Sequence, residues 1–381
     1  MRAELIELLD RQVTPPKSKA VGKLTALPCL RDIVIYGAGH WGGLVWRILR
    51  NTHQLPCFAD SNPLRQGEIF CGLPIRAPEE LADICRTKPL ILVAIEEACL
   101  DASVYHALLQ RIEHCGLKDY EIIFLDYHDL GRYKNYDDKF CRLHKSALID
   151  LYAWLGDNFS RQTLIEWLRL NREKDIYNYP VLSPQYFQAD LFELRADEVI
   201  VDCGAFDGDT VDSVIEYYKN FTHVYAYEPH PQAYRKLCRR VNIYEEDIRS
   251  KISAYQCAVA ADNREQYFNI AKFRGARLSS KGTVKVPVKK LDDLLKSVRF
   301  TLLKMDIEGS ELAALRGAEE VIKNNDPVLC ICLYHREADI IDIPAWIRDR
   351  FPRYSLYLRK HANRYASELV LYAIPPYRGR F

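Results

Sequence analysis

The stretch "VIVDCGAFDGDTV" (Val199–Val211) decides the fold of the second half of the chain. Its apolar beginning has the length and composition of a buried strand, and a helical pattern follows after two glycines. A strand that passes through a glycine turn into a helix is typical of a doubly wound α/β unit. The turn contains more acids than a turn needs, namely Asp202, Asp207 and Asp209. We therefore expect this turn to hold a ligand.

Length and charge narrow the class of protein. A chain of 381 residues exceeds one ordinary hydrophobic core, so we expect two domains. A net charge of +1 gives no field for an anionic partner, and we expect neither nucleic acid nor a membrane surface. The apolar runs are far shorter than a membrane span of about 20 residues. The charged N-terminus lacks the apolar core of a signal peptide, and the 12 cysteines are scattered singly, so we expect a cytoplasmic protein with reduced thiols.

Strand and helix patterns alternate in two separate parts of the chain, and such alternation predicts parallel sheets. A helical segment rich in aromatic residues separates the two parts. We expect two Rossmann-like α/β domains joined by a helical connector. The predicted divisions are an N-terminal helix and loop at 1–28, a Rossmann-like domain at 29–130, the connector at 131–190 and the second α/β domain at 191–381.

The acids of the mid-chain turn indicate which ligand it holds. Backbone N–H groups at a helix N-terminus favour an anion, but neighbouring carboxylates would repel a phosphate. S-adenosylmethionine fits this turn, because it carries an ammonium, a sulfonium and a ribose but no phosphate. Glu228, in "YAYEPHP" (225–231), ends the next strand and can accept hydrogen bonds from both ribose hydroxyls. Ala258, in "CAVA" at the end of the third strand, can flank an adenine.

Further candidates for chemistry lie at the ends of two later strands. Asp306 leaves the strand of "LLKMDIEGSE" (302–311) at the edge where open α/β sheets bind ligands, and Glu308 and Glu311 follow within one turn. Helix capping explains Glu311 equally well. His335 ends "PVLCICLYH" (327–335) and reaches the same edge; its alternative is a capping or surface histidine. We expect Asp306, Glu308 or His335 to take a proton from a hydroxyl, and we predict no metal site.

The order of these motifs resembles a known family. The stretches "DCGAFDGDT", "YAYEPHP", "VPVKKLDDLL", "LLKMDIEGSELAALRGA" and "PVLCICLYH" are similar to those of the FkbM-type methyltransferases, which are S-adenosylmethionine-dependent O-methyltransferases acting mostly on sugar or polyketide-type hydroxyls. The resemblance runs from about Tyr186 to Pro375, and it implies a class I methyltransferase fold for 191–381. It also implies that Asp306 lies near the transferred methyl. The chain departs from the family at Arg277, where a smaller residue is frequent.

The predicted cofactor site combines the resemblance with the reasoning from the residues. Its members lie in the turn and at the strand ends: Asp202, Gly204, Ala205, Phe206, Asp207, Gly208, Asp209, Thr210, Glu228, Ala258 and Asp306.

An earlier glycine turn, "GAGHWG" (37–42), has the spacing of dinucleotide-binding folds. Gly37, Gly39 and Gly42 follow a strand and open a helix, and Asp60 ends the next strand where a ribose-binding acid is expected. We interpret this unit as a nucleotide or nucleotide-sugar recognition domain. Its alternatives are an active NAD(P) domain and a fold retained for packing. Trp41 is bulky for close approach of a pyrophosphate.

The resulting prediction is an S-adenosylmethionine-dependent O-methyltransferase that acts on a small-molecule or glycan acceptor with a sugar or related hydroxyl. A base at the sheet edge deprotonates the hydroxyl, and in-line displacement moves the methyl group. The alternative is an NAD(P)-dependent oxidoreductase or nucleotide-sugar-binding protein that uses the turn at Gly37–Gly42. A third interpretation is a sensor or scaffold without turnover. The acceptor and the oligomeric state stay open.

Overall fold

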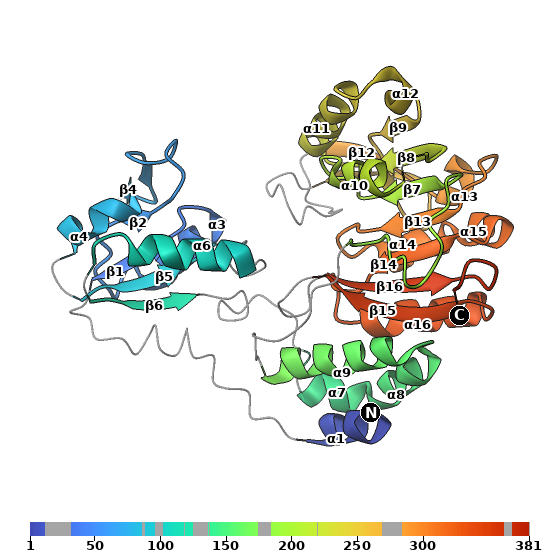
Figure 1. Ribbon diagram of the computed structural model, residues 1–381, viewed down its shortest axis with the longest axis horizontal. Coiled ribbons are helices and arrows are strands. Elements are labelled where there is room, and N and C mark those ends of the chain that lie inside the picture. Colours follow the sequence, from blue (N-terminus) through green and yellow to red (C-terminus); the bar gives the residue numbers. More distant parts are fainter. Residues whose placement is uncertain are drawn as a thin grey trace.

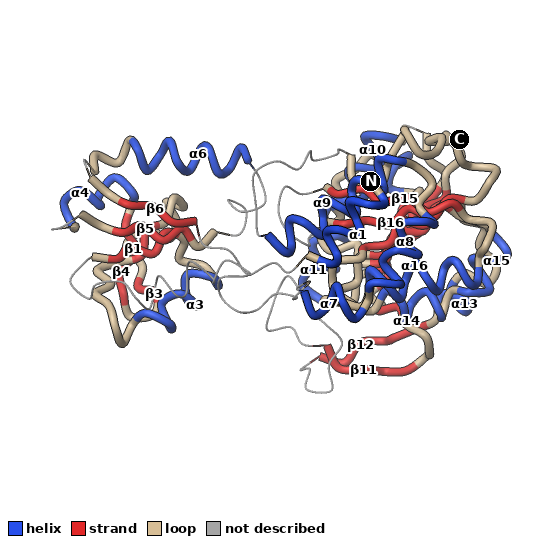
Figure 2. The backbone as a smooth tube through the Cα atoms, turned by 90° about the horizontal axis from the view of Figure 1, so that it is seen from below, coloured by secondary structure: helices blue, strands red, loops and turns tan. Residues whose placement is uncertain are grey.

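The computed structural model describes residues 1–11, 32–85, 88–95, 102–117, 119–124, 136, 138–173, 184–218, 220–268, 284–361 and 368–380. Within these ranges the chain forms two α/β units, each built around its own sheet (Figures 1 and 2). None of the described helices has the length and the apolar composition that crossing a membrane requires. The described cysteines are free thiols.

The first unit has a six-stranded sheet in the order β3-β4-β2-β1-β5-β6, in which only the β3–β4 pairing is antiparallel. Alternate residues of β1 enter two different hydrophobic clusters, so both faces of this strand are covered. The elements are β1 (Ile33–Tyr36), α3 (His40–Leu49), β2 (Phe58–Ala59), β3 (Ile69–Phe70), β4 (Leu73–Arg76), η1 (Pro78–Glu80), α4 (Leu81–Ile84), β5 (Leu90–Val93), α6 (Ala102–Glu113) and β6 (Glu121–Phe124).

The second unit has a seven-stranded sheet in the order β15-β16-β14-β13-β7-β8-β9. Its strands are β7 (Val199–Cys203), β8 (His223–Tyr227), β9 (Ile252–Tyr255), β13 (Leu302–Met305), β14 (Val328–Cys332), β15 (Ser355–Lys360) and β16 (Leu369–Ile374). The strands from β9 to β14 are parallel, whereas β16 is antiparallel to both of its neighbours. The chain order reverses between β7 and β13. Such a switch point is where open α/β sheets bind ligands, beyond the carboxyl ends of the strands.

Helices cover both faces of this second sheet. Apolar residues of α14, α15 and α16 enter one core cluster with one face of the sheet, and residues of α10 and α11 enter another cluster with the opposite face. These helices are α10 (Asp209–Tyr217), α11 (Pro231–Asn242), α12 (Glu246–Arg249), α13 (Leu291–Leu294), α14 (Glu311–Arg316), α15 (Glu319–Asn325) and α16 (Asp339–Arg350).

The segment predicted as a connector packs into the core of the second unit. Its described helices are α7 (Asp138–Leu143), α8 (Lys145–Trp154) and α9 (Asn158–Glu173), and α1 (Arg2–Asp10) packs with them (Figure 1). The indole of Trp167 on α9 is fully buried and meets the ring of Tyr136 edge-on, 4.4 Å between centroids. Leu5 of α1 belongs to the same hydrophobic cluster. The predicted boundaries near residues 28 and 130 lie outside the described residues.

A small three-stranded sheet corrects one predicted element. β10 (Ala258–Val259) pairs in parallel with β12 (Val284–Lys289), which pairs antiparallel with β11 (Arg264–Phe268). The prediction that "CAVA" ends the third strand is therefore wrong. β9 stops at Tyr255, the chain turns at Cys257, and Ala258 lies opposite Val288 in the smaller sheet.

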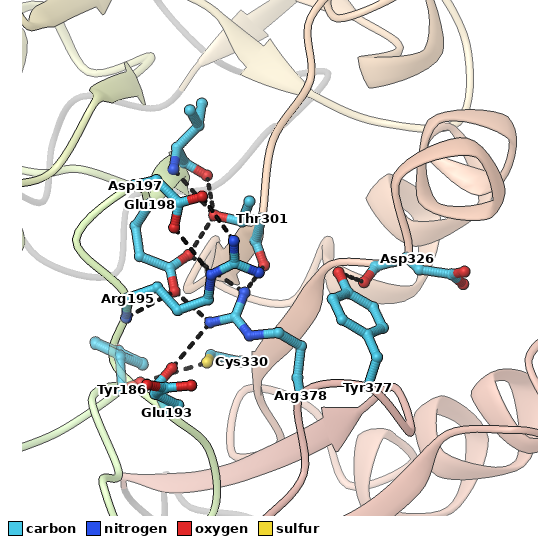
Figure 3. A network of polar contacts seen from close by, with 11 residues as sticks. Tyr186, Glu193, Arg195, Asp197, Glu198, Thr301, Asp326, Cys330, Tyr377 and Arg378 are labelled. Atoms are coloured by element: carbon cyan, nitrogen blue, oxygen red, sulfur yellow. Dashed lines mark hydrogen bonds and ion pairs between the residues drawn. The ribbon is translucent and has the colours of Figure 1, made fainter.

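A buried ion pair fastens the C-terminal segment to the amino edge of the second sheet (Figure 3). Glu198, immediately before β7, pairs with Arg378, and both side chains are buried. The Arg378 guanidinium also donates to the Glu193 carbonyl at 3.0 Å. The Thr301 hydroxyl donates to the Glu198 carboxylate and accepts the Val199 N–H at 2.9 Å. We call Glu198, Thr301 and Arg378 the amino-edge group.

Candidate functional site

Two loops meet at the switch point between β7 and β13. The turn after β7 carries Gly204, whose φ is +86°, and Phe206, whose φ is +45°. A Cβ atom at Gly204 would overlap the carbonyl oxygen of Asp306, so a side chain there would push the two loops apart. Gly208, with φ of +94°, then begins α10 as its N-cap. The predicted turn and the predicted strand end thus lie against one another.

Asp202 is paired with a protein cation, and its predicted contact with the cofactor stays a prediction. Its carboxylate is fully buried, and Oδ1 lies 2.8 Å from Nζ of the buried Lys304. The Lys304 ammonium also donates to the Gly204 carbonyl at 2.8 Å. Burial alone would lower the pKa of Lys304, but the Asp202 and Asp306 carboxylates raise it above its ordinary value. Asp202 therefore acts on the turn through Lys304, which the sequence analysis missed although it is a lone cation inside an apolar strand.

The other acids of the turn also have protein partners. Asp207 Oδ2 lies 3.4 Å from a guanidinium nitrogen of Arg240 on α11, and Arg240 also pairs with Asp212. Asp209 is the first residue of α10, where an acid is favoured by the helix dipole. Thr210 is the second residue of the helix and is buried. Part of the charge of these acids is therefore balanced within the protein, and the prediction that they mark a cationic ligand stays a prediction.

Glu228 joins the end of β8 to the glycine turn. Its Oε2 accepts the Phe206 N–H at 2.9 Å, and its Oε1 accepts the His230 N–H at 2.6 Å. Burial raises the pKa of Glu228 to about 7. His230 begins α11, and its Nδ1 accepts the Gln232 N–H at 3.2 Å, so this histidine is a helix cap. The carboxylate therefore stands beside the turn, where a ribose-binding acid was predicted.

Asp306, Glu308, Glu311 and His335 converge, and we call these four residues the acid–histidine cluster. His335 Nδ1 lies 2.7 Å from Glu311 Oε1. His335 Nε2 lies 3.2 Å from Asp306 Oδ1 and 3.7 Å from Glu308 Oε2. The His335 side chain is 5% exposed and that of Glu311 is fully buried, whereas that of Asp306 is 26% exposed. The structure thus brings together the three predicted residues and places Glu311 behind them.

The surroundings of His335 favour the protonated ring, and its predicted role as the base stays a prediction. Both ring nitrogens face carboxylate oxygens, so both serve as donors and the ring carries a proton. Burial alone would lower the pKa of His335, but Glu311, Asp306 and Glu308 raise it to about 9. The ring therefore has no free nitrogen with which to accept a proton at neutral pH.

Two tyrosines hold the carboxylate of Asp306. The Tyr186 hydroxyl donates to Asp306 Oδ2 at 3.1 Å, and the Tyr334 hydroxyl donates to Asp306 Oδ1 at 3.1 Å. Burial raises the pKa of Asp306, but His335 and Lys304 outweigh this effect, and the pKa is lowered. The result is an oriented, ionised carboxylate at the switch point. The sequence analysis missed both tyrosines, although Tyr334 stands next to His335 in "LYH".

The glycine turn of the first unit uses several of its predicted residues for packing. A Cβ atom at Gly42 would overlap the Gly37 carbonyl oxygen, so the helix and the turn need this glycine for close contact. Asp60 Oδ2 accepts the Ala38 N–H at 3.0 Å, and its Oδ1 accepts the Asn62 N–H at 2.9 Å. One oxygen of Asp60 thus holds the turn and the other binds the chain just after Asp60, which its predicted ribose-binding role did not anticipate.

Gly39 and Trp41 of this turn differ in their surroundings. Trp41 packs against the core of the first unit, whereas Gly39, the N-cap of α3, has open space around its Cα atom. A side chain at Gly39 would therefore meet no neighbouring atom.

Comparison with known proteins gives a match in the second unit. Residues 202–365 match the family model described as Methyltransferase FkbM domain. The crystal structure of Methyltransferase FkbM from Methylobacillus flagellatus KT is similar at a TM-score of 0.66 and 23% identity, over 97% of this chain and 97% of that chain. The predicted α/β fold, with a methyltransferase-type sheet in the second unit, is confirmed. No curated protein matches the chain.

Two more distant structures cover parts of the chain. Fibrillarin from Aeropyrum pernix, in complex with S-adenosyl-L-methionine, matches 47% of this chain and 67% of that chain at 10% identity and a TM-score of 0.29. UDP-D-quinovosamine 4-dehydrogenase from Vibrio fischeri matches 26% of this chain and 83% of that chain at 19% identity and a TM-score of 0.21. Similarity this low carries no argument about ligands.

Proposed function

We propose that this chain, which carries an FkbM methyltransferase domain, is an S-adenosylmethionine-dependent O-methyltransferase acting on a sugar or related hydroxyl. The observation that supports it best is the meeting of the β7 turn with Asp306 at the switch point, with Glu228 beside both. This is the place where an α/β sheet of this order binds ligands. An acceptor bound beside Asp306 would contact both the cofactor and the acid–histidine cluster.

The residues around the turn suit the parts of S-adenosylmethionine. Glu228 has two carboxylate oxygens for the ribose hydroxyls, and the backbone N–H groups at the start of α10 suit the methionyl carboxylate. Ala258 follows the end of the third strand and is proposed to flank the adenine. The ionised Asp306 is partly exposed at the crevice and is proposed to lie near the transferred methyl. Bound there, the cofactor supplies a methyl group on a positively charged sulfur.

The protein's remaining task is to align the acceptor and remove its proton. A neutral hydroxyl is a weak nucleophile, and a positioned base contributes about 10²–10⁴-fold. Since His335 already carries a proton, Asp306 or Glu308 is proposed to accept the hydroxyl proton. The acceptor oxygen then bonds to the methyl carbon while the carbon–sulfur bond breaks, which yields the demethylated thioether. Arg277, at which the chain departs from the family, lies outside the described residues.

A second candidate function belongs to the first unit. The open space at Gly39 favours a nucleotide or nucleotide sugar at the start of α3, and an NAD(P)-dependent oxidoreductase is the corresponding alternative for the whole chain.

Calorimetry with S-adenosylhomocysteine and with NADH tests the two candidates on the full chain. We expect S-adenosylhomocysteine to bind, Glu228→Ala to weaken its binding at least tenfold, and Asp60→Ala to leave it unchanged. Binding of NADH together with no binding of S-adenosylhomocysteine would reverse the order of the two proposals.

A further inference from the structure

The acid–histidine cluster gathers several carboxylates around one imidazole. Asp306 accepts from two neutral tyrosine hydroxyls and faces His335. Glu311 accepts the Ile307 N–H at 2.9 Å and faces the same imidazole. Asp306 and Glu311 therefore face the same ring at 3.2 and 2.7 Å, and Glu308 Oε2 lies 3.7 Å from its Nε2. Buried charges of this kind are normally paired or coordinate a metal.

An unpartnered oxygen supplies a second, independent observation. Glu311 is fully buried, and its Oε2 has no hydrogen-bond partner among the described residues. Its Oε1, in contrast, has both the Ile307 N–H and His335. A buried carboxylate oxygen without a donor is costly, and such an atom points to a group that the protein alone does not provide. Glu311 Oε2 can thus still bind a cation or accept a hydrogen bond from a water attached to one.

The orientation of the imidazole matches that of a metal ligand. Histidines that bind metals usually donate the second ring N–H to a carboxylate, which fixes the ring. Glu311 holds His335 Nδ1 in this way and turns Nε2 toward Asp306 and Glu308. Ligand atoms at about 2.1 Å from one ion lie roughly 3.0–3.4 Å apart. The distances of 3.2 and 3.7 Å from Nε2 to the two carboxylate oxygens are close to that range.

We propose that the acid–histidine cluster is a divalent-cation site, with Asp306, His335 and Glu308 as ligands and Glu311 as the residue that positions His335; the ion takes the place of the proton on His335 Nε2, which passes to water. This proposal reverses our prediction from the sequence that the site has no metal. One ligand atom each from Asp306, Glu311 and His335 lies within 4.8 Å of the others. Imidazole nitrogen combined with carboxylate oxygen suits borderline or hard ions such as Mn²⁺. A water on the ion would supply the donor that Glu311 Oε2 lacks.

A divalent ion at this site would activate the acceptor hydroxyl. This part of the proposal rests on the proposed function. Because Asp306 is partly exposed toward the crevice, the ion would keep positions open there. A hydroxyl bound to a divalent ion loses its proton more readily. With Asp306 and Glu308 bound to the ion, the hydroxyl proton passes to water instead of to either carboxylate, and the oxygen bonds to the methyl carbon as the carbon–sulfur bond breaks. Suitable acceptors are then sugar or related compounds with a hydroxyl free to approach the ion.

Titration of the metal-free full chain with Mn²⁺, followed by the electron paramagnetic resonance of the free ion, tests the site. We expect one Mn²⁺ per chain. Glu311→Gln should weaken binding about 10–100-fold, as changes to a residue behind a metal ligand do. Asp306→Asn should weaken it at least as much, and this partly exposed position serves as the second variant if Glu311→Gln does not fold. Circular dichroism checks folding of each variant.

Glu228→Gln is the matched control, because it changes a buried carboxylate of the same unit outside the cluster. We expect it to bind Mn²⁺ as the unchanged chain does while losing affinity for S-adenosylhomocysteine. The proposal would be overturned if the unchanged chain does not bind Mn²⁺. It would also be overturned if Asp306→Asn and Glu311→Gln bind Mn²⁺ as tightly as the unchanged chain does. Mn²⁺ binding in a chain that binds no S-adenosylhomocysteine would uphold the metal site and contradict the proposed function alone.

Discussion

The amino-edge group and the acid–histidine cluster lie at opposite edges of one sheet and are built differently. At the amino edge, the single carboxylate of Glu198 meets the single guanidinium of Arg378, and both are buried (Figure 3). At the carboxyl edge, three carboxylates surround His335, and Asp306 is partly exposed. His335 and Glu311 are as buried as the amino-edge pair, but the number of acids and the access differ. A closed one-to-one pair serves the fold, whereas several acids around one ring at a partly exposed edge are suited to a ligand.

The largest effect is expected from breaking the balanced group. Glu198→Ala leaves the Arg378 guanidinium buried without its partner, so the free energy of unfolding should fall by about 3–5 kcal/mol. Urea denaturation measures it. The double change Glu198→Met with Arg378→Met should recover much of the loss, because it removes both charges together. A loss below about 1 kcal/mol in Glu198→Ala would show that the pair does not hold this edge.

A change in the acid–histidine cluster should lower the rate of methyl transfer strongly and the stability only slightly. Asp306→Asn keeps an oxygen acceptor for the tyrosines but removes the charge at the crevice. Methyl transfer should therefore fall by about 10²-fold or more. The free energy of unfolding should change by less than about 1 kcal/mol, since one of several repelling carboxylates is removed. Transfer assays with labelled cofactor and urea denaturation of the same preparation compare the two effects. A variant that loses stability but keeps its rate would assign Asp306 to the fold.

The architecture could be predicted largely because strand and helix patterns repeat locally along the chain. The break between β9 and β10 could not, because "ISAYQCAVA" reads as one apolar run and the competing partner, Val288, lies far along the chain. The packing of α1 with α7–α9 likewise depends on contacts between distant segments.

The site was predictable where strand ends alone determine position. Asp306 and His335 follow neighbouring parallel strands, and such strands end at the same edge of a sheet. The partners of the acids were not predictable in the same way. Arg240 reaches Asp207 from the following helix, and Tyr186 reaches Asp306 across 120 residues of sequence. The sequence analysis therefore overestimated the free negative charge of the turn.

A smaller effect should follow from loosening Asp306 while its charge stays. Tyr334→Phe removes one hydrogen bond to an ionised carboxylate, which contributes about 1.5–3 kcal/mol, so methyl transfer should fall roughly tenfold. Tyr377→Phe is the matched control at the amino edge, where the hydroxyl donates to the Asp326 carbonyl at 2.9 Å (Figure 3). We expect this control to keep its rate. Equal rates for both variants would mean that the orientation of Asp306 does not limit the reaction.

The smallest predicted effect is the pH dependence of the protein's stability that the titration of Glu228 causes. Burial raises its pKa from the ordinary 4.5 to about 7, with Lys304 opposing and Asp202 adding to the shift. The folded protein therefore binds this proton more tightly than the unfolded chain. The resulting stability is fully present below pH 4.5 and is lost as the pH rises through about 7.

Ligand affinity should change in the opposite direction over the same range. Ribose hydroxyls donate to the ionised carboxylate, so the affinity for S-adenosylhomocysteine should rise severalfold between pH 6 and pH 8 while the stability of the free protein falls. Calorimetry and thermal unfolding at matched pH values measure the two trends. Glu228→Gln should remove this part of both, because the amide does not titrate. If affinity falls toward pH 8 in the unchanged chain but not in Glu228→Gln, Glu228 binds its ligand as the neutral acid, and its proposed place at the ribose is wrong.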